Sequence, residues 1–181
     1  MRVLSRQRGV TLIELTVTVA VAAVLLMIAV PSFRNITLSN RLNTAANDLV
    51  NAISVARMEA VKRNASTQFC SNSASANSTD SLGSTCGTQT GAVQAMQGPS
   101  VEPVLAGVAG ITAPIQLDGD LVALRFSAQG VARQVGSSTP YGNVVADICT
   151  SQLSRNNHRV ITMVAGSILT TTLDSRACPS S

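Results

Sequence analysis

The chain has few aromatic and few charged residues, and these shortages limit what it can be. Its 181 residues include no tryptophan, one tyrosine, three phenylalanines and one histidine, and only 12% of them are charged. A folded core must therefore be built from aliphatic side chains. The chain also lacks a Gly-x-Ser-x-Gly elbow, a glycine-rich phosphate loop and a Cys-x-x-Cys pair, which are patterns typical of hydrolases, nucleotide sites and zinc sites.

These absences lead us to expect no enzymatic activity, no cofactor and no metal site. The single histidine, His158, stands between Asn157 and Arg159 at the start of a predicted strand. A serine hydrolase would need a serine, a histidine and an acid brought together. We interpret His158 as a surface or turn residue.

A long apolar run near the N-terminus is not followed by a signal-peptide cleavage site. Sixteen uncharged, mostly apolar residues, Leu15 to Val30, follow Glu14, and no Ala-x-Ala-like site closes the run, so we expect it to stay in the mature protein. Residues 1–9 carry three arginines and no acid, which keeps this leader on the cytoplasmic side. We predict a cleaved leader at 1–9, a transmembrane or fibre-core helix at 10–30 and a periplasmic head at 31–181.

The residues Arg8-Gly9-Val10-Thr11-Leu12-Ile13-Glu14-Leu15, followed by the apolar run and then Pro31, resemble the class III signal of type IV prepilins and type II secretion pseudopilins. The resemblance implies that a prepilin peptidase cuts after Gly9 and methylates the new amine of Val10. The family usually has phenylalanine at this first mature position, so Val10 is a departure. It also implies placement in the bacterial inner membrane, then in a pilus fibre or at its tip.

Glu14 is an acid inside the apolar segment, and such a residue is a functional candidate by default. A charge near the bilayer centre costs about 2.5 to 3.5 kcal/mol on translocon scales. While the protein is a membrane monomer, Glu14 can reach the nearby interface. In a filament, the resemblance implies that Glu14 pairs with the N-terminal amine of a neighbouring subunit and so favours the correct axial register.

The pattern predicts one helix from Val10 to about Asn64, with Pro31 expected to bend it. Beyond the bend, apolar residues recur at spacings of three and four, as expected for a face that packs on a sheet. These residues are Leu42, Ala45, Ala46, Leu49, Ile53, Ala56 and Ala60.

After Asn64 the pattern changes to short runs rich in Val, Ile, Leu and Thr, separated by turn residues. The predicted strands are 66–70, 92–97, 121–127, 144–149, 159–164 and 168–173. Three prolines, Pro99, Pro103 and Pro114, limit the middle segment to edge strands or loops. A long helix followed by antiparallel strands is an α+β arrangement, with the helix covering one face of a sheet.

The head resembles the branch that contains the minor pilins FimT and FimU and the minor pseudopilin GspH. The segments that carry this resemblance are Ala56–Val61, Leu124–Gly130, Asp147–Cys149, His158–Thr162 and Ala165–Gly166. It implies the pilin fold and a role in a filament with other major and minor pilins. Gly130 is either a turn residue with positive φ or an ordinary hairpin glycine.

Four cysteines in an exported domain indicate disulfides in an oxidising compartment. Three pairings are possible. We favour Cys70 with Cys86, which closes a polar loop, and Cys149 with Cys178, which fastens the C-terminal tail to a strand.

Two classes of function remain, assembly and ligand binding. We favour a minor pilin that enters or primes a type IV pilus, with a minor pseudopilin of type II secretion as an alternative. Some FimT-like pilins take up DNA through a basic tail with a Gly-Arg-x-Arg pattern, but here Gly166 is followed by Ser-Ile-Leu. The candidate DNA contacts are then Arg155, Arg159 and Arg176, which are more simply explained as solvated residues. DNA binding is possible but not favoured, because beyond Asn64 five arginines face six acids.

Overall fold

A computed structural model describes residues 11–77 and 80–179. The chain divides between Thr37 and Leu38 into two units, and each is described by itself. Gly9 and Val10, the residues expected at the processing site, lie outside the described residues.

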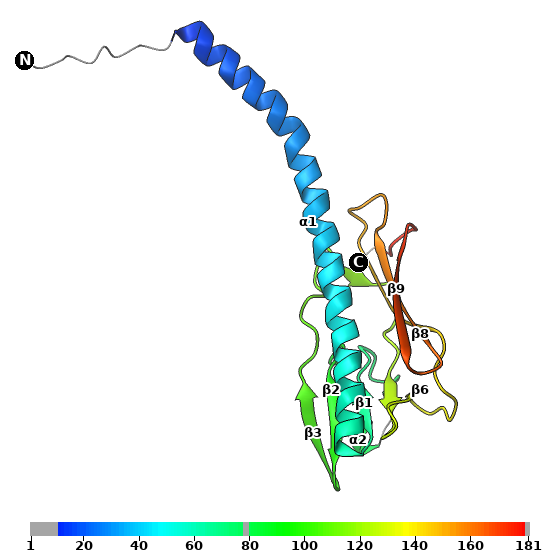
Figure 1. Cartoon of the computed structure of the whole chain (residues 1–181). Helices are drawn as coiled ribbons and strands as arrows, with labels where there is room; N and C mark the ends of the chain where they lie inside the picture. Colours follow the sequence, from blue (N-terminus) through cyan, green and yellow to red (C-terminus); the bar gives the residue numbers. More distant parts are fainter. Residues whose placement is uncertain (1–10, 78–79, 180–181) are drawn as a thin grey trace, which may run out of the picture. The chain divides into compact units, whose positions relative to one another are not determined.

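Helix α1 (Leu12–Arg63) is 52 residues long and continues through Pro31 (Figure 1). It ends at Asn64, which has a positive φ of 50°. The N–H groups of Asn64 and Ala65 donate to the carbonyls of Val61 and Ala60, at 3.2 and 3.1 Å. These bonds satisfy carbonyls that the helix end leaves free. The predicted C-terminal end of the helix is therefore confirmed.

The described residues beyond Asn64 form two antiparallel sheets and one short helix. The first sheet has the order β3-β2-β1-β5-β6 and contains β1 (Thr67–Phe69), β2 (Val93–Gln97), β3 (Ser100–Leu105), β5 (Leu124–Phe126) and β6 (Ala132–Gln134). The second has the order β4-β7-β8-β9 and contains β4 (Gln116–Leu117), β7 (Val144–Cys149), β8 (His158–Val164) and β9 (Ile168–Asp174). Helix α2 (Ser81–Ser84) lies between β1 and β2 in the chain.

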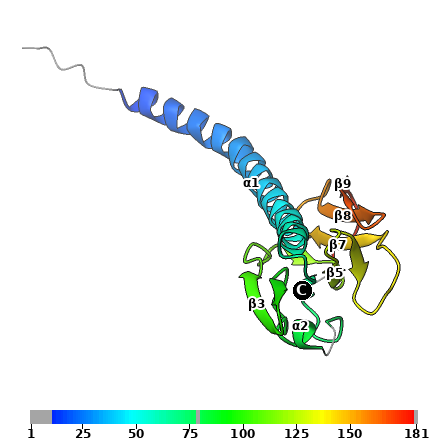
Figure 2. The same ribbon diagram turned by 60° about the horizontal axis from the view of Figure 1, so that its bottom comes forward.

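The C-terminal half of α1 packs into a core to which both sheets contribute (Figures 1 and 2). The predicted apolar stripe is confirmed, because all seven of its residues are buried, and Ala52 joins them. Phe69 and Phe126 of the first sheet and Ile148 and Ile161 of the second pack in the same cluster. Apart from the two phenylalanines the cluster is aliphatic, as the composition required.

The α+β class is confirmed, and all six predicted strands are present, with ends that differ by up to three residues. Elements β4, β6 and α2, each of only two to four residues, were not predicted, and the segment of the six-residue strand β3 was left open as an edge strand or loop. Sequence analysis predicted a sheet face for the helix but did not separate the strands into two sheets. Strand β3 contains Pro103 and lies at a sheet edge, as the proline requires. Gly130 has a φ of 73° and lies in the hairpin that joins β5 to β6, so it is both a turn residue with positive φ and a hairpin glycine.

Candidate assembly site

The N-terminal part of α1, residues 12–37, presents an apolar surface that no described residue covers. Large side chains on it are exposed, including Leu12 at 81%, Met27 at 76% and Phe33 at 72%. An 18-residue window within α1 has a mean hydropathy of 2.5, and none of it is buried. This length and composition are sufficient to cross a bilayer. Exposed apolar surface of this extent marks a contact with membrane or protein.

Glu14 lies in the first turn of α1, within this apolar segment. Its N–H donates to Thr11 Oγ1 at 3.3 Å. The hydroxyls of Thr16 and Thr18 donate to backbone carbonyls three residues earlier, both at 2.9 Å, so their polar groups are satisfied within the helix. The Glu14 carboxylate has no cationic partner among residues 11–77 and 80–179. Any ion pair it makes must therefore involve a group outside them.

Arg159 is buried in the head, with 2% exposure. Its Nε donates to Asn43 Oδ1 at 2.7 Å and its Nη2 to Ser39 Oγ at 3.1 Å, both on α1. Its Nη1 donates to the carbonyls of Asn156 and His158, at 2.7 and 2.9 Å. Burial lowers the pKa of Arg159 below its usual value. The interpretation of Arg159 as a solvated residue is wrong, because it fastens β8 to α1.

His158 is also buried, so its interpretation as a surface or turn residue is wrong. Its Nδ1 lies 2.9 Å from Asp147 Oδ1 and 3.9 Å from Asp118 Oδ2. Arg176 contacts both of these carboxylates, with Nη2 at 3.4 Å from Asp118 Oδ2 and in a shorter contact with Asp147 Oδ2, and its Nη1 lies 3.1 Å from Asp174. Asp118, Asp147 and His158 have ligand atoms within 4.8 Å of one another, close enough for a metal site, but the Arg176 guanidinium already supplies the positive charge here.

The three arginines proposed as DNA contacts do not form one basic surface. Arg159 is buried, and Arg176 is paired with three acids. Arg155 is exposed. Two of the three guanidiniums are thus engaged in contacts within the head.

Two disulfides tie loops of the head to its strands. Cys70 is bonded to Cys86, with their Cα atoms 5.5 Å apart, and Cys149 to Cys178, with their Cα atoms 5.8 Å apart. The first closes the loop that contains α2. The second fastens the C-terminal tail to β7, beside the cluster that includes Arg176.

Strand β9 is an edge strand without the features that usually protect an edge. It pairs with β8 over seven residues, and its other side has no backbone hydrogen bond to described residues. It carries no charge before Asp174, and Ile168 and Leu173 are 59% and 58% exposed. The other edges are protected, because β3 contains Glu102 and Pro103 and β4 and β6 are very short.

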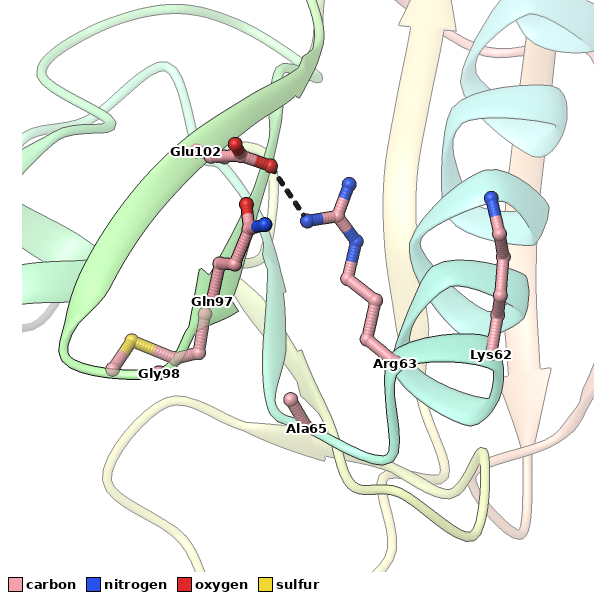
Figure 3. A pocket seen from close by; sticks show the side chains of 7 residues that line it. Lys62, Arg63, Ala65, Gln97, Gly98 and Glu102 are labelled. Carbon is pink, nitrogen blue, oxygen red and sulfur yellow. Dashed lines mark hydrogen bonds and ion pairs between the residues drawn. The ribbon is translucent and has the colours of Figure 1, made fainter.

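A cavity of about 440 Å³ lies between the C-terminal end of α1 and the β2–β3 hairpin. Arg63 Nη1 reaches across it to Glu102 at 2.8 Å, whereas Lys62 points away from this contact (Figure 3). Glu59 accepts hydrogen bonds from Arg63 and Lys62, and these bonds lower the pKa of Glu59. These ion pairs join the hairpin to the helix end.

An uncovered apolar helix with an acid in its first turn, followed by an antiparallel β head, is the arrangement of a pilin-like subunit and is consistent with a membrane anchor. Residues 45–166 match the family described as Type II transport protein GspH, and residues 4–30 match the prokaryotic N-terminal methylation motif. The first match spans more than half of the chain, which therefore belongs to the GspH family. Comparison with curated proteins and with solved structures gave no match.

The chain is accordingly a minor pilin or pseudopilin of a type IV pilus or of type II secretion. The methylation motif implies processing by a prepilin peptidase and assembly with other pilins. The family is a structural one.

Proposed function

We propose that this protein is inserted in the bacterial inner membrane with its head on the periplasmic side, and then enters or primes a type IV pilus as a minor subunit. The observation that carries the proposal is the uncovered apolar half of α1 with Glu14 at its start. In a membrane, lipid covers this surface. In a filament, the equivalent helices of other subunits cover it, and Glu14 meets the amine of a neighbouring subunit.

The head adds a second contact in this proposal, through the free edge of β9. An edge strand with unpaired N–H and C=O groups can pair with a strand of another head. The exposed apolar side chains of Ile168 and Leu173 would be covered by the same contact. A pseudopilus of type II secretion would use both contacts in the same way.

The type of filament is tested by determining in which assembly the protein is recovered. A tagged chain should appear in sheared surface pili, together with the major pilin. Recovery only with secretion pseudopilins, and none in sheared pili, would favour the secretion alternative.

Processing should remove residues 1–9, because the basic leader ends at Gly9 within the matched methylation motif. We expect the mature chain to begin at Val10 and to carry a methyl group on its amine. Intact-mass measurement of protein from cells with and without the prepilin peptidase tests both steps. A chain that keeps its leader in the assembled filament would contradict the proposal, whereas a cleaved but unmethylated Val10 would contradict only the methylation.

Placing a lysine in the middle of β9 should weaken association with other pilin heads. Thr171 is exposed, so Thr171→Lys should change the free energy of unfolding by no more than about 0.5 kcal/mol. A charged side chain in the contact should nevertheless lower copurification with other pilins by about fivefold, equivalent to about 1 kcal/mol. The matched control is Ser100→Lys on the edge strand β3. If the two variants copurify equally with other pilins, β9 is not the contact.

A further inference from the structure

A row of polar residues crosses the face of the first sheet that is turned away from the core. Gln94 pairs with Gln68, Gln68 with Arg125, and Arg125 with Arg133, each in direct cross-strand register. The residues on either side of Arg125, Leu124 and Phe126, are buried in the core cluster. Because side chains alternate along a strand, the polar row lies on the opposite face.

The first arginine of this row is already compensated. Arg125 Nη1 and Nη2 bind the Asp80 carboxylate, and Nη2 also donates to Gln68 Oε1. The hydrogen bonds from Arg125 hold the pKa of Asp80 at about 2. Asp80 in turn accepts from the N–H of Gly83 at 2.8 Å, as the N-cap of α2. Asp80, the residue before α2, is thus fixed against Arg125.

The second arginine is not compensated. Arg133 is exposed, and no acid of the described part of the chain pairs with it. Like charges directly opposite each other on neighbouring strands are unfavourable, but Asp80 already offsets the charge of Arg125. The uncompensated charge is that of Arg133, and an anion beside its guanidinium would compensate it.

A cavity of about 130 Å³ lies beside these two arginines. Both arginines and the hydroxyl residues Ser66, Ser127 and Ser137 line it, and its lining includes no acid. Two buried atoms of lining residues, Arg125 Nε and Ser127 Oγ, have no hydrogen-bond partner among described residues. Buried polar atoms without a partner are uncommon and unfavourable. Both atoms are enclosed, so an anion in the cavity would first contact the exposed Arg133 guanidinium.

We propose that this cavity between β5 and the turn after β6 is an oxyanion site, and that its occupant in a filament is a carboxylate side chain of a neighbouring subunit. Guanidinium groups and hydroxyls are the donors that carboxylates and phosphates prefer. The volume is well below that of sites for drug-sized ligands, which fits one small anionic group. The chain's own acid on this face, Asp80, is held by Arg125, so the occupant comes from outside. The choice of a subunit carboxylate rests on the proposed assembly function, whereas the anion site does not.

The site is tested on the full-length mature chain in detergent micelles, labelled with ¹⁵N. Inorganic phosphate and acetate are titrated at constant ionic strength while the arginine Nε–H resonances are followed. We expect saturable shifts at Arg125 and Arg133, and Arg133→Gln should weaken binding about tenfold. The matched control, Arg155→Gln, replaces another exposed arginine and should leave binding unchanged. Shifts that do not saturate, or that are equal at every arginine, would overturn the site.

Whether a carboxylate of a neighbouring subunit occupies the site is tested by measuring how much of each variant enters filaments. Arg133→Glu should lower the amount of protein in filaments about fivefold, and Arg155→Glu should not. Thermal unfolding of both variants should match that of the unchanged protein, since both side chains are exposed. Phosphate binding together with unchanged incorporation of Arg133→Glu would overturn the subunit carboxylate as the occupant. Failure of the unchanged protein to enter any filament would instead overturn the proposed assembly function.

Discussion

Replacing Glu14 with alanine is expected to leave the protein in the membrane but to remove most of it from filaments. Membrane insertion depends on the apolar residues of α1, and loss of an acid makes the segment more apolar. In the proposed filament, the N-terminal amine of one subunit lies among apolar helices. Without Glu14 that amine has no counter-charge, and an unpaired charge in such surroundings is strongly unfavourable. We expect incorporation to fall about tenfold or more, equivalent to about 1.4 kcal/mol.

The measurement compares the amounts of the variant in membrane and sheared-filament fractions. Thr16→Ala is the matched control, because Thr16 lies on the same part of α1 and, among the described residues, its hydroxyl bonds only to the Ile13 carbonyl. This control should enter filaments as the unchanged protein does. Equal incorporation of Glu14→Ala and Thr16→Ala would show that the charge pair is not needed.

The helix and its buried face could be predicted from the sequence because both depend on local periodicity. Residues such as Leu42, Leu49 and Ile53 recur at helical spacing, and all three are buried. The C-terminal end of α1 could also be predicted, since Asn64 tolerates the positive φ that closes a helix. Six strands were found for a similar reason, because runs rich in Val, Ile, Leu and Thr stand between turn residues. Strand β3 is as long as β7, but Pro103 left its segment open as an edge strand or a loop.

Two features of the fold could not be predicted, because they depend on contacts between distant residues. Strands β4 and β6 are too short to show an alternation of apolar and polar residues in the sequence. They are held by pairing with β7 and β5. The division into two sheets depends on which strands pair, and this is not encoded in any one segment.

The buried polar residues of the head show the same limit. His158 and Arg159 look like solvated residues in the sequence because they follow Asn156 and Asn157. Their partners Asp147, Asn43 and Ser39 lie 11 to 120 positions away along the chain. No local pattern connects them. By contrast, the processing and assembly motif is contiguous, and the matched methylation motif covers it.

Arg159→Ala is expected to destabilise the head by about 3 kcal/mol, the largest stability effect we predict. The change removes four donated hydrogen bonds, leaves Asn43 and Ser39 of α1 without this partner and opens a cavity. Urea unfolding of the full chain in detergent micelles, followed by circular dichroism, measures the effect. The matched control is Arg155→Ala, which should change the free energy of unfolding by no more than about 0.5 kcal/mol.

The conservative variant Arg159→Lys separates this structural role from the DNA-binding alternative. A lysine keeps the charge but cannot reproduce the planar fork that reaches Asn43, Ser39 and two carbonyls, so it should still destabilise the head by about 2 kcal/mol. A phosphate contact would behave differently, because lysine also neutralises a phosphate. DNA binding is measured by mobility shift across a series of salt concentrations. Two results together would show that the arginines bind DNA: Arg159→Lys keeps full stability, and Arg155→Ala lowers both the DNA affinity and its dependence on salt. We expect weak DNA binding that neither variant changes, since the described head uses Arg159 and Arg176 in its own contacts.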